Sequence, residues 1–291
     1  FVLTNGKSND FFSKIVSLRH PKNAVHTASG ILGALQDADI SKICKEIDEN
    51  GFAIMDAKLT DQMVNDITKF AETTPVRYLE FDKKLITYSE EEVIFDENKR
   101  ISPRYQFKME QILENQTIQD LCFDDSLRAI ANNYLNAVPI VDIITMWWSV
   151  PYGKEAEDKA AQMFHFDMER FKFLKFFFYI SDVDTNTGPH CYVRKSHKGL
   201  PKSINKDRRI TDEEIAANYP AEDILELCGK KGSIIAVDTR GMHKGKSLTE
   251  GKRLLFQIQF SNSLFGDTTP VAENVKLTES NQKKKEAHSR S

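Results

Sequence analysis

The chain has 291 residues, with 40 basic and 43 acidic side chains and a formal net charge of −3 at pH 7. It contains no basic stripe of the kind that neutralises phosphates, which argues against a nucleic-acid-binding protein. No apolar run approaches the ~18 residues that a membrane-spanning helix requires. The four cysteines lie far apart and form neither a zinc-binding spacing nor a disulfide framework, so we expect a reducing, cytoplasmic setting.

The length suits one large domain, to which we assign residues 38–265. Residues 1–37 are expected to form an N-terminal extension, in which a few apolar residues suggest a short amphipathic helix. Residues 266–291 are polar, and we expect them to form a disordered tail.

The first half of this domain has the apolar spacing of helices. Amphipathic helices are predicted after Asp39, after Thr60 and over residues 117–135. Residues 52–55 form a short predicted strand between the first two helices. Residues 74–110 are polar and irregular, and we expect an excursion over the body that acts as a lid.

After Pro139 the sequence becomes rich in β-branched and aromatic residues, which is typical of strands. A polar insertion at 199–220 contains a capping box, Thr211 to Glu214, that opens a short helix. The predicted strands cover 140–150, 163–167, 173–181, 190–194, 223–228, 233–237 and 253–261. Helices followed by strands, without βα alternation, argue for a mainly β fold with flanking helices, either a jelly roll or a double-stranded β-helix.

The only His-x-Asp of the chain lies at His165 and Asp167. In a β-strand, side chains two apart point to the same face, so the imidazole and the carboxylate would project side by side. They are two of the three ligands of an Fe(II) site formed by two histidines and one carboxylate, which leaves positions open for other ligands. On its own the motif also suits a surface strand with a hydrogen-bonded histidine.

A third ligand must come from elsewhere in the chain. Three histidines lie within the strand region, namely His190, His197 and His243. His243 follows the strand 233–237 through a turn, and antiparallel strands of a barrel would bring that turn to the mouth where the His-x-Asp lies. His190 and His197 are more typical of turn or supporting positions.

Arg253 opens a later strand in which alternate residues share one face. A guanidinium inside an apolar barrel needs an anionic partner, because an unpaired buried charge is costly. A ligand carboxylate held by two parallel hydrogen bonds meets that need. Lys252 is the competing cation, but the alternation places it on the opposite face.

The order of these motifs resembles the phytanoyl-CoA dioxygenase family of Fe(II)- and 2-oxoglutarate-dependent oxygenases. The resemblance runs over about residues 38–262 and includes ENGFAIM at 49–55, HFD at 165–167 and TGPH at 187–190. It continues with the DTRGMHKG segment at 238–245, followed by Arg253. One departure is Arg-Lys at 194–195, where many members have Pro-Gly, and we expect a local change of turn there.

The resemblance implies a double-stranded β-helix core. It also implies Fe(II) held by His165, Asp167 and His243, with 2-oxoglutarate bound at its distal carboxylate by Arg253 and O2 as the second cosubstrate. Relatives that halogenate have a small residue at the position of Asp167, so the carboxylate here implies hydroxylation or a related oxidation. The expected reaction is hydroxylation of a small-molecule substrate with release of succinate and CO2.

Two other classes of protein remain open. The jelly roll is also a scaffold for non-catalytic small-molecule binding, because fold does not determine function. A zinc-dependent hydrolase would use the same ligands but leaves Arg253 without a role.

Several further residues have two readings from the sequence. Asp238 and Thr239 could orient the ligands from behind or simply form a turn. Gln257 could face the pocket. Arg104, Arg170 and Arg240 could meet an acidic substrate, but we expect a solvated surface position for each.

Overall fold

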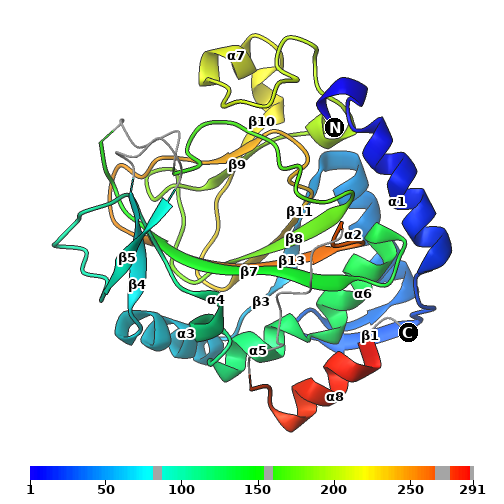
Figure 1. Ribbon diagram of the computed structural model, residues 1–291, viewed down its shortest axis with the longest axis horizontal. Coiled ribbons are helices and arrows are strands. Elements are labelled where there is room, and N and C mark those ends of the chain that lie inside the picture. Colours follow the sequence, from blue (N-terminus) through cyan, green and yellow to red (C-terminus); the bar gives the residue numbers. More distant parts are fainter. Residues whose placement is uncertain (81–86, 154–159, 266–275, 289–291) are drawn as a thin grey trace.

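A large antiparallel sheet runs through the middle of the computed structural model (Figure 1). The structure describes residues 1–291 except 81–86, 154–159, 266–275 and 289–291. Within the described part, none of the helices combines the length and the apolar character needed to cross a membrane.

Helices precede and follow the strands along the chain. They are α1 (Lys7–Arg19), α2 (Asp37–Asn50), α3 (Asp61–Thr73), α4 (Met109–Ile112), α5 (Gln116–Cys122), α6 (Asp125–Leu135), α7 (Asp212–Ala216) and α8 (Glu279–His288). The strands are β1 (Thr27–Gly30), β2 (Gly33–Gln36), β3 (Phe52–Lys58), β4 (Val76–Glu80), β5 (Thr87–Val93), β6 (Arg104–Gln106), β7 (Ile140–Ser149), β8 (Phe173–Tyr179), β9 (His190–Val193), β10 (Ile224–Leu227), β11 (Ser233–Val237), β12 (His243–Gly245) and β13 (Arg253–Ser261).

The strands form two sheets that face each other and a separate hairpin. The large sheet has the order β3-β11-β8-β13-β7-β6-β4-β5, and the small one has the order β10-β9-β12. An apolar cluster lies between them, with Phe177 and Leu255 from the large sheet and Tyr192 and Leu227 from the small one. Helices α3, α5 and α6 lie below the large sheet in Figure 1, whereas β9 and β10 lie above it. This is the double-stranded β-helix with flanking helices that the sequence predicted.

Alternation along the strands separates a helix-facing core from a cavity. In β13, Leu254 and Phe256 join the core that contains the helices. Arg253 and Leu255 point to the opposite side and line the cavity. Burying a large apolar side chain contributes roughly 1.5–3 kcal/mol, so the even-numbered residues of this strand hold it in register.

The central strand β8 is buried over its whole length. It lies between β11 and β13 and is covered on both faces, so it has a nearly continuous apolar sequence in place of an alternating one. Its one charged residue is Lys175, which is 7% exposed and faces the cavity.

The predicted helix over 117–135 is in fact two helices, α5 and α6. Asp124 interrupts it because its Oδ1 accepts hydrogen bonds from the backbone N–H groups of Ser126 and Leu127 and so caps α6. The capping box predicted at Thr211 is confirmed, and it opens α7.

Residues 74–110 are not an irregular lid. Their described part contains β4, β5 and β6, which extend the large sheet beyond β7. These edge strands are short and half exposed, so their sequence lacks the apolar signature of the central strands. Residues 81–86 lie outside the described part. The strand predicted at 163–167 is reduced to isolated bridges, Phe164 with Ile210 and His165 with His243.

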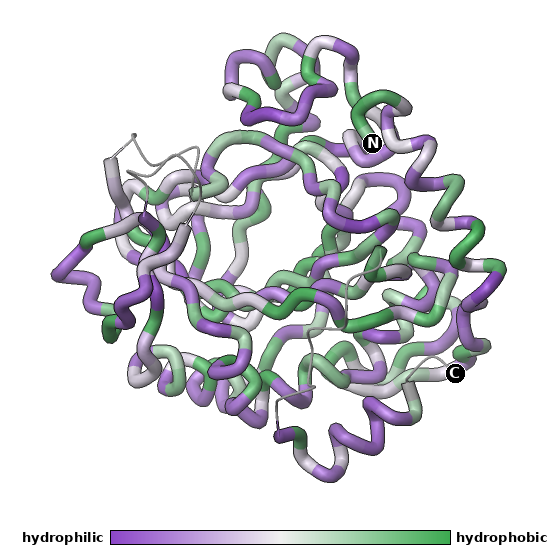
Figure 2. The backbone as a smooth tube through the Cα atoms, in the orientation of Figure 1, coloured by the Kyte–Doolittle hydropathy of each residue, from purple (hydrophilic) through white to green (hydrophobic). Residues whose placement is uncertain are grey.

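The N-terminal extension packs against the end of β13, and the C-terminal region packs against helix α5. In the N-terminal extension, Ser13 of α1 is buried and accepts a hydrogen bond from Asn262 Nδ2 at 2.8 Å. In the C-terminal region, for which we expected disorder, Glu279–His288 form helix α8, and Asn281 donates to Asp120 at 2.9 Å. This helix is largely hydrophilic in Figure 2, so no apolar face identifies it in the sequence.

Candidate functional site

Three side chains meet at one end of the space between the sheets. His165, Asp167 and His243 each offer one possible ligand atom, and these three atoms lie within 4.8 Å of one another. We call these residues the metal-ligand cluster, which is the group found among the described residues that could hold a metal ion. His165 Nε2 is 3.9 Å from Asp167 Oδ1, and His243 Nε2 is 3.5 Å from Asp167 Oδ2. The structure therefore brings together the three residues that the sequence singled out.

Backbone carbonyls hold both imidazoles with the same nitrogen facing the cluster. Nδ1 of His165 lies 2.9 Å from the carbonyl of Met163, and Nδ1 of His243 lies 2.9 Å from that of Gly241. With Nδ1–H donated to a carbonyl, Nε2 carries the lone pair that a metal needs. The donor set of two imidazole nitrogens and one carboxylate thus fits a divalent iron with an open face.

The ligand segments are tied directly to each other. The N–H of His165 donates to the carbonyl of His243 at 2.9 Å, and the reciprocal hydrogen bond has the same length. The N–H of Asp167 donates to the carbonyl of Thr239 at 2.9 Å. The turn that precedes His243 therefore sets the position of all three ligands.

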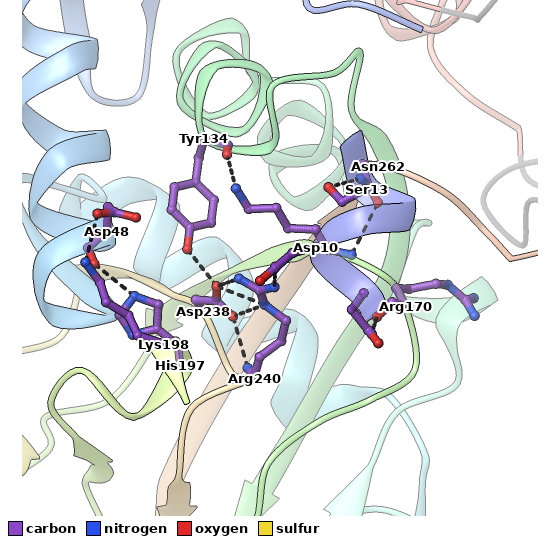
Figure 3. A network of polar contacts seen from close by, with 12 residues as sticks. Asp10, Ser13, Asp48, Tyr134, Arg170, His197, Lys198, Asp238, Arg240 and Asn262 are labelled. Carbon is purple, nitrogen blue, oxygen red and sulfur yellow. Dashed lines mark hydrogen bonds and ion pairs between the residues drawn. The ribbon is translucent and has the colours of Figure 1, made fainter. Parts of the chain in front are cut away.

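A buried ion pair holds this turn in place (Figure 3). Arg240 donates from Nη2 to Asp238 Oδ2 at 2.6 Å and from Nη1 to Asp10 of helix α1 at 3.0 Å. Tyr134 of helix α6 donates to Asp238 Oδ2 at 2.6 Å. Burial alone would raise the pKa of Asp238, but the Arg240 guanidinium offsets this and holds the pKa below its usual range. The supporting role considered for Asp238 therefore has a structural basis.

Lys175 is a partner of the cluster that the sequence analysis missed. Its Nζ lies 2.6 Å from Asp167 Oδ2 and 3.0 Å from Glu169 Oε1. Burial would raise the pKa of Asp167, but Lys175 and the two histidines lower it, so the carboxylate is charged. The signal was a lysine within the apolar run of β8, which requires a buried anion nearby.

Arg253 lies at the other end of a cavity of about 240 Å³ that begins at the metal-ligand cluster. Its Nη2 donates to Ser149 Oγ at 3.2 Å, while its Nε is buried and has no hydrogen-bond partner among the described residues. Burial lowers the pKa of Arg253 to about 10, so the side chain is still charged at neutral pH. A cation in this state is suited to an incoming anion.

The strands β6, β7, β13 and β8 supply the cavity wall. Trp147 faces the cavity and Trp148 the helical core, as expected for two successive residues of a strand. Lys252 points to the Trp148 side, where its Nζ lies 3.3 Å from Glu97. The cavity lining also includes Gln257.

The three arginines expected at a solvated surface are elsewhere. Arg104 lines the cavity with its guanidinium 4.2 Å from the ring centre of Trp147. Arg170 pairs with the buried Asp142 at 2.8 Å, and Arg240 belongs to the ion pair described above. Each of these arginines contacts a residue from a distant segment: Trp147, Asp142 and Asp10, respectively. The local sequence around an arginine does not reveal such a contact.

The two remaining histidines of the strand region have different positions. His197 Nε2 lies 2.9 Å from the carbonyl of Asp48, away from the cavity. His190 is only 5% exposed and lines the cavity. Burial, followed by the electrostatic interactions with His243 and Arg253, lowers the pKa of His190, so its imidazole is neutral.

The fold and the cluster define a double-stranded β-helix protein with a centre of two histidines and one carboxylate. The chain belongs to the phytanoyl-CoA dioxygenase (PhyH) family, whose model matches residues 47–254. This family is part of the Fe(II)- and 2-oxoglutarate-dependent oxygenase superfamily, which uses Fe(II), 2-oxoglutarate and O2. Among curated proteins, none matches the sequence.

Solved structures with a similar fold share little sequence with this chain. One is the epimerase SnoN in complex with Fe3+, alpha ketoglutarate and nogalamycin RO (14% identity, TM-score 0.54, 84% of this chain and 97% of that one). Another is EctD from S. alaskensis with bound Fe (14%, 0.54, 83% and 83%). A third is HygX from Streptomyces hygroscopicus with nickel, 2-oxoglutarate and hygromycin B bound (14%, 0.50, 76% and 86%). At these identities the likeness shows the fold.

Proposed function

We propose that this protein is an Fe(II)- and 2-oxoglutarate-dependent dioxygenase that hydroxylates an unactivated C–H bond of a small organic or lipid-like substrate. One observation carries the proposal. Three metal-ligand side chains lie at one end of a cavity, and the incompletely bonded guanidinium of Arg253 lies at the other. A short dicarboxylate can bind to both ends at once.

Fe(II) would be held by His165, Asp167 and His243, which occupy one face of the ion. The bound iron supplies the redox chemistry through which O2 and 2-oxoglutarate yield succinate, CO2 and an oxidised substrate. The presence of Asp167 supports hydroxylation or a related oxidation over halogenation, because halogenating relatives carry a small residue at that position.

The chain's own residues orient the reactants. Arg253 would bind the distal carboxylate of 2-oxoglutarate through two hydrogen bonds. Lys175 holds one oxygen of Asp167 at 2.6 Å and so limits rotation of this carboxylate. The apolar faces of Trp147, Phe177 and Leu255 line the cavity and exclude water from the reacting groups.

A second cavity supports a separate place for the substrate. Its volume is about 400 Å³, and it shares His165 and Asp167 with the first cavity but not the wall that contains Arg253. Residues 206–209, from the polar insertion, form its outer side. We expect the substrate to reach the metal from this side and the insertion to contribute to specificity.

The test is an anaerobic titration of the metal-free protein with Fe(II) and 2-oxoglutarate, followed by visible absorption. We expect the weak charge-transfer band of the chelate only when both are present, and we expect its loss in Arg253→Ala. Subsequent exposure to O2 should produce succinate. Iron binding without the band would refute the proposal.

The same experiment separates the alternative classes. A non-catalytic binding module would produce no succinate after exposure to O2. A hydrolase would bind Zn(II) but would have no affinity for 2-oxoglutarate that depends on Arg253. Neither alternative explains why a buried guanidinium faces the metal-ligand cluster across the cavity.

A further inference from the structure

His190 is a polar residue in the cavity that the proposed chemistry has not used. Its side chain is 5% exposed and lines the cavity together with Arg253 and the metal-ligand cluster. Nε2 is buried and has no hydrogen-bond partner among the described residues. A buried ring nitrogen without a partner is destabilising, so its presence requires a physical reason.

The register of the small sheet places His190 between the two ends of the cavity. In the pairing of β9 with β12, His190 lies opposite Gly245. Gly245 follows the metal-ligand residue His243 by two positions in β12. Its ring centre is 5.4 Å from that of His243 and 4.7 Å from that of Phe177. The imidazole therefore lies beside the path from the metal-ligand cluster toward Arg253.

Packing alone does not explain a histidine at this position. The ring lies between the rings of Phe177 and His243, where phenylalanine would fill the same space without an unsatisfied nitrogen. The ring differs from phenylalanine in having nitrogens that can form hydrogen bonds. A neutral imidazole can donate one N–H, and the ligand that this cavity suits is an anion rich in acceptor oxygens.

We propose that His190 is a cosubstrate-binding residue whose Nε2–H donates a hydrogen bond to an oxygen of 2-oxoglutarate. This inference rests on the proposed function and goes beyond the three ligands and Arg253. The hydrogen bond forms only when the cavity is filled. His190 therefore destabilises the empty protein slightly and strengthens binding of the cosubstrate.

The test compares His190→Phe with the parent protein by anaerobic calorimetry. Fe(II) is titrated first, and 2-oxoglutarate is then titrated into the Fe(II)-loaded protein. We expect the dissociation constant for 2-oxoglutarate to rise about tenfold, as for the loss of one hydrogen bond to a charged group. We expect the affinity for Fe(II) to stay unchanged and the melting temperature of the metal-free variant to be equal to or above that of the parent.

Two further variants separate binding from packing. His190→Gln keeps an N–H donor and should recover part of the affinity for 2-oxoglutarate. His197→Phe changes the neighbouring histidine, which bonds Asp48 outside the cavity, and should bind 2-oxoglutarate like the parent. Unchanged affinity in His190→Phe overturns the inference. The inference is also overturned if His190→Phe loses affinity for both 2-oxoglutarate and Fe(II) and His190→Gln recovers neither. A parent protein that binds Fe(II) but not 2-oxoglutarate overturns the proposed function as well.

Discussion

Two buried groups of charged side chains lie on either side of the turn at 238–243, and they differ in how completely they are paired. Behind the turn, Arg240 bonds both Asp238 and Asp10, and Asp238 also accepts from Tyr134. In the cavity, the one hydrogen bond that Arg253 makes to a described residue is with the hydroxyl of Ser149. Its Nε is left without a described partner.

The difference distinguishes structural support from ligand binding. Charges that are fully paired inside the protein are costly to disturb, because removal of one partner leaves the other uncompensated. A charge that lacks a partner instead reduces stability until a ligand supplies one. The comparison therefore assigns the Asp238–Arg240 pair to positioning and the cavity to binding, and variants in the two regions should behave in opposite ways.

The largest effect is expected at the metal-ligand cluster. His165→Ala removes one of three ligands and should abolish Fe(II) binding, measured as metal content after reconstitution and gel filtration. The fold should remain, since the hydrogen bonds between residues 165 and 243 are made by the backbone. Ser247→Ala, a change outside the cluster, serves as the control. Normal iron content in His165→Ala would falsify the ligand assignment.

The same substitution in the two regions should change stability with opposite sign. Arg240→Met leaves Asp238 buried and unpaired, and should lower the free energy of unfolding by about 3–5 kcal/mol. Arg253→Met removes an incompletely bonded buried cation and should leave that free energy unchanged or higher in the metal-free protein. Urea denaturation of both variants tests this. Equal losses in the two variants would mean that Arg253 has a structural role.

The stability of the metal-free protein should fall with acid because its ligand histidines are buried and neutral. Burial, followed by the electrostatic interaction with His243, lowers the pKa of His165 to about 3, against roughly 6.5 in an unfolded chain. Between these values only the unfolded state binds the proton. The contribution of neutral His165 to the free energy of unfolding is therefore complete above about pH 6.5. It is lost as the pH falls below this value, at up to ~1.4 kcal/mol per pH unit.

Denaturation at several pH values from 7.5 to 4.5 measures this slope. A His165→Leu variant lacks the titrating group and should show a shallower dependence on pH than the parent. Identical slopes would mean that His165 titrates alike in the folded and unfolded states.

The smallest effect is expected at the outer edge of the supporting network. Asp10 is 59% exposed at its side chain, so its ion pair with Arg240 is screened by water. Asp10→Asn should reduce stability by less than about 1 kcal/mol, because Arg240 keeps Asp238. Thermal denaturation measures the change, and Asp61→Asn at the exposed start of α3 is a suitable control. A loss as large as that of Arg240→Met would show that helix α1 is essential to the turn.

The parts of the site that the sequence predicted depend on local spacing or on motif order. The His-x-Asp pair, His243 and Arg253 follow from such patterns, and the alternation correctly separates Arg253 from Lys252. Strand β8 was recognised because both of its faces are buried and its sequence is strongly apolar, and β13 because apolar residues alternate with polar ones along it.

The parts that it missed depend on distant partners. Arg240 and Asp10 are 230 positions apart, and neither segment shows that the other is its neighbour. Lys175 pairs with residues of the preceding loop, whose course the sequence does not define. The direction of His190 depends on the register of β9 with β12, so its position in the cavity could not be inferred from the TGPH segment.

The reciprocal hydrogen bonds between His165 and His243 also bear on how the protein matures. Each of these residues has its backbone fixed by the other, and each ring is oriented by a carbonyl before any metal arrives. Metal binding then requires little ordering of the chain, unlike a small metal-dependent domain that folds only around its ion. The polypeptide can therefore reach its final shape first and take up iron last, and a chelator should strip the metal without unfolding the barrel.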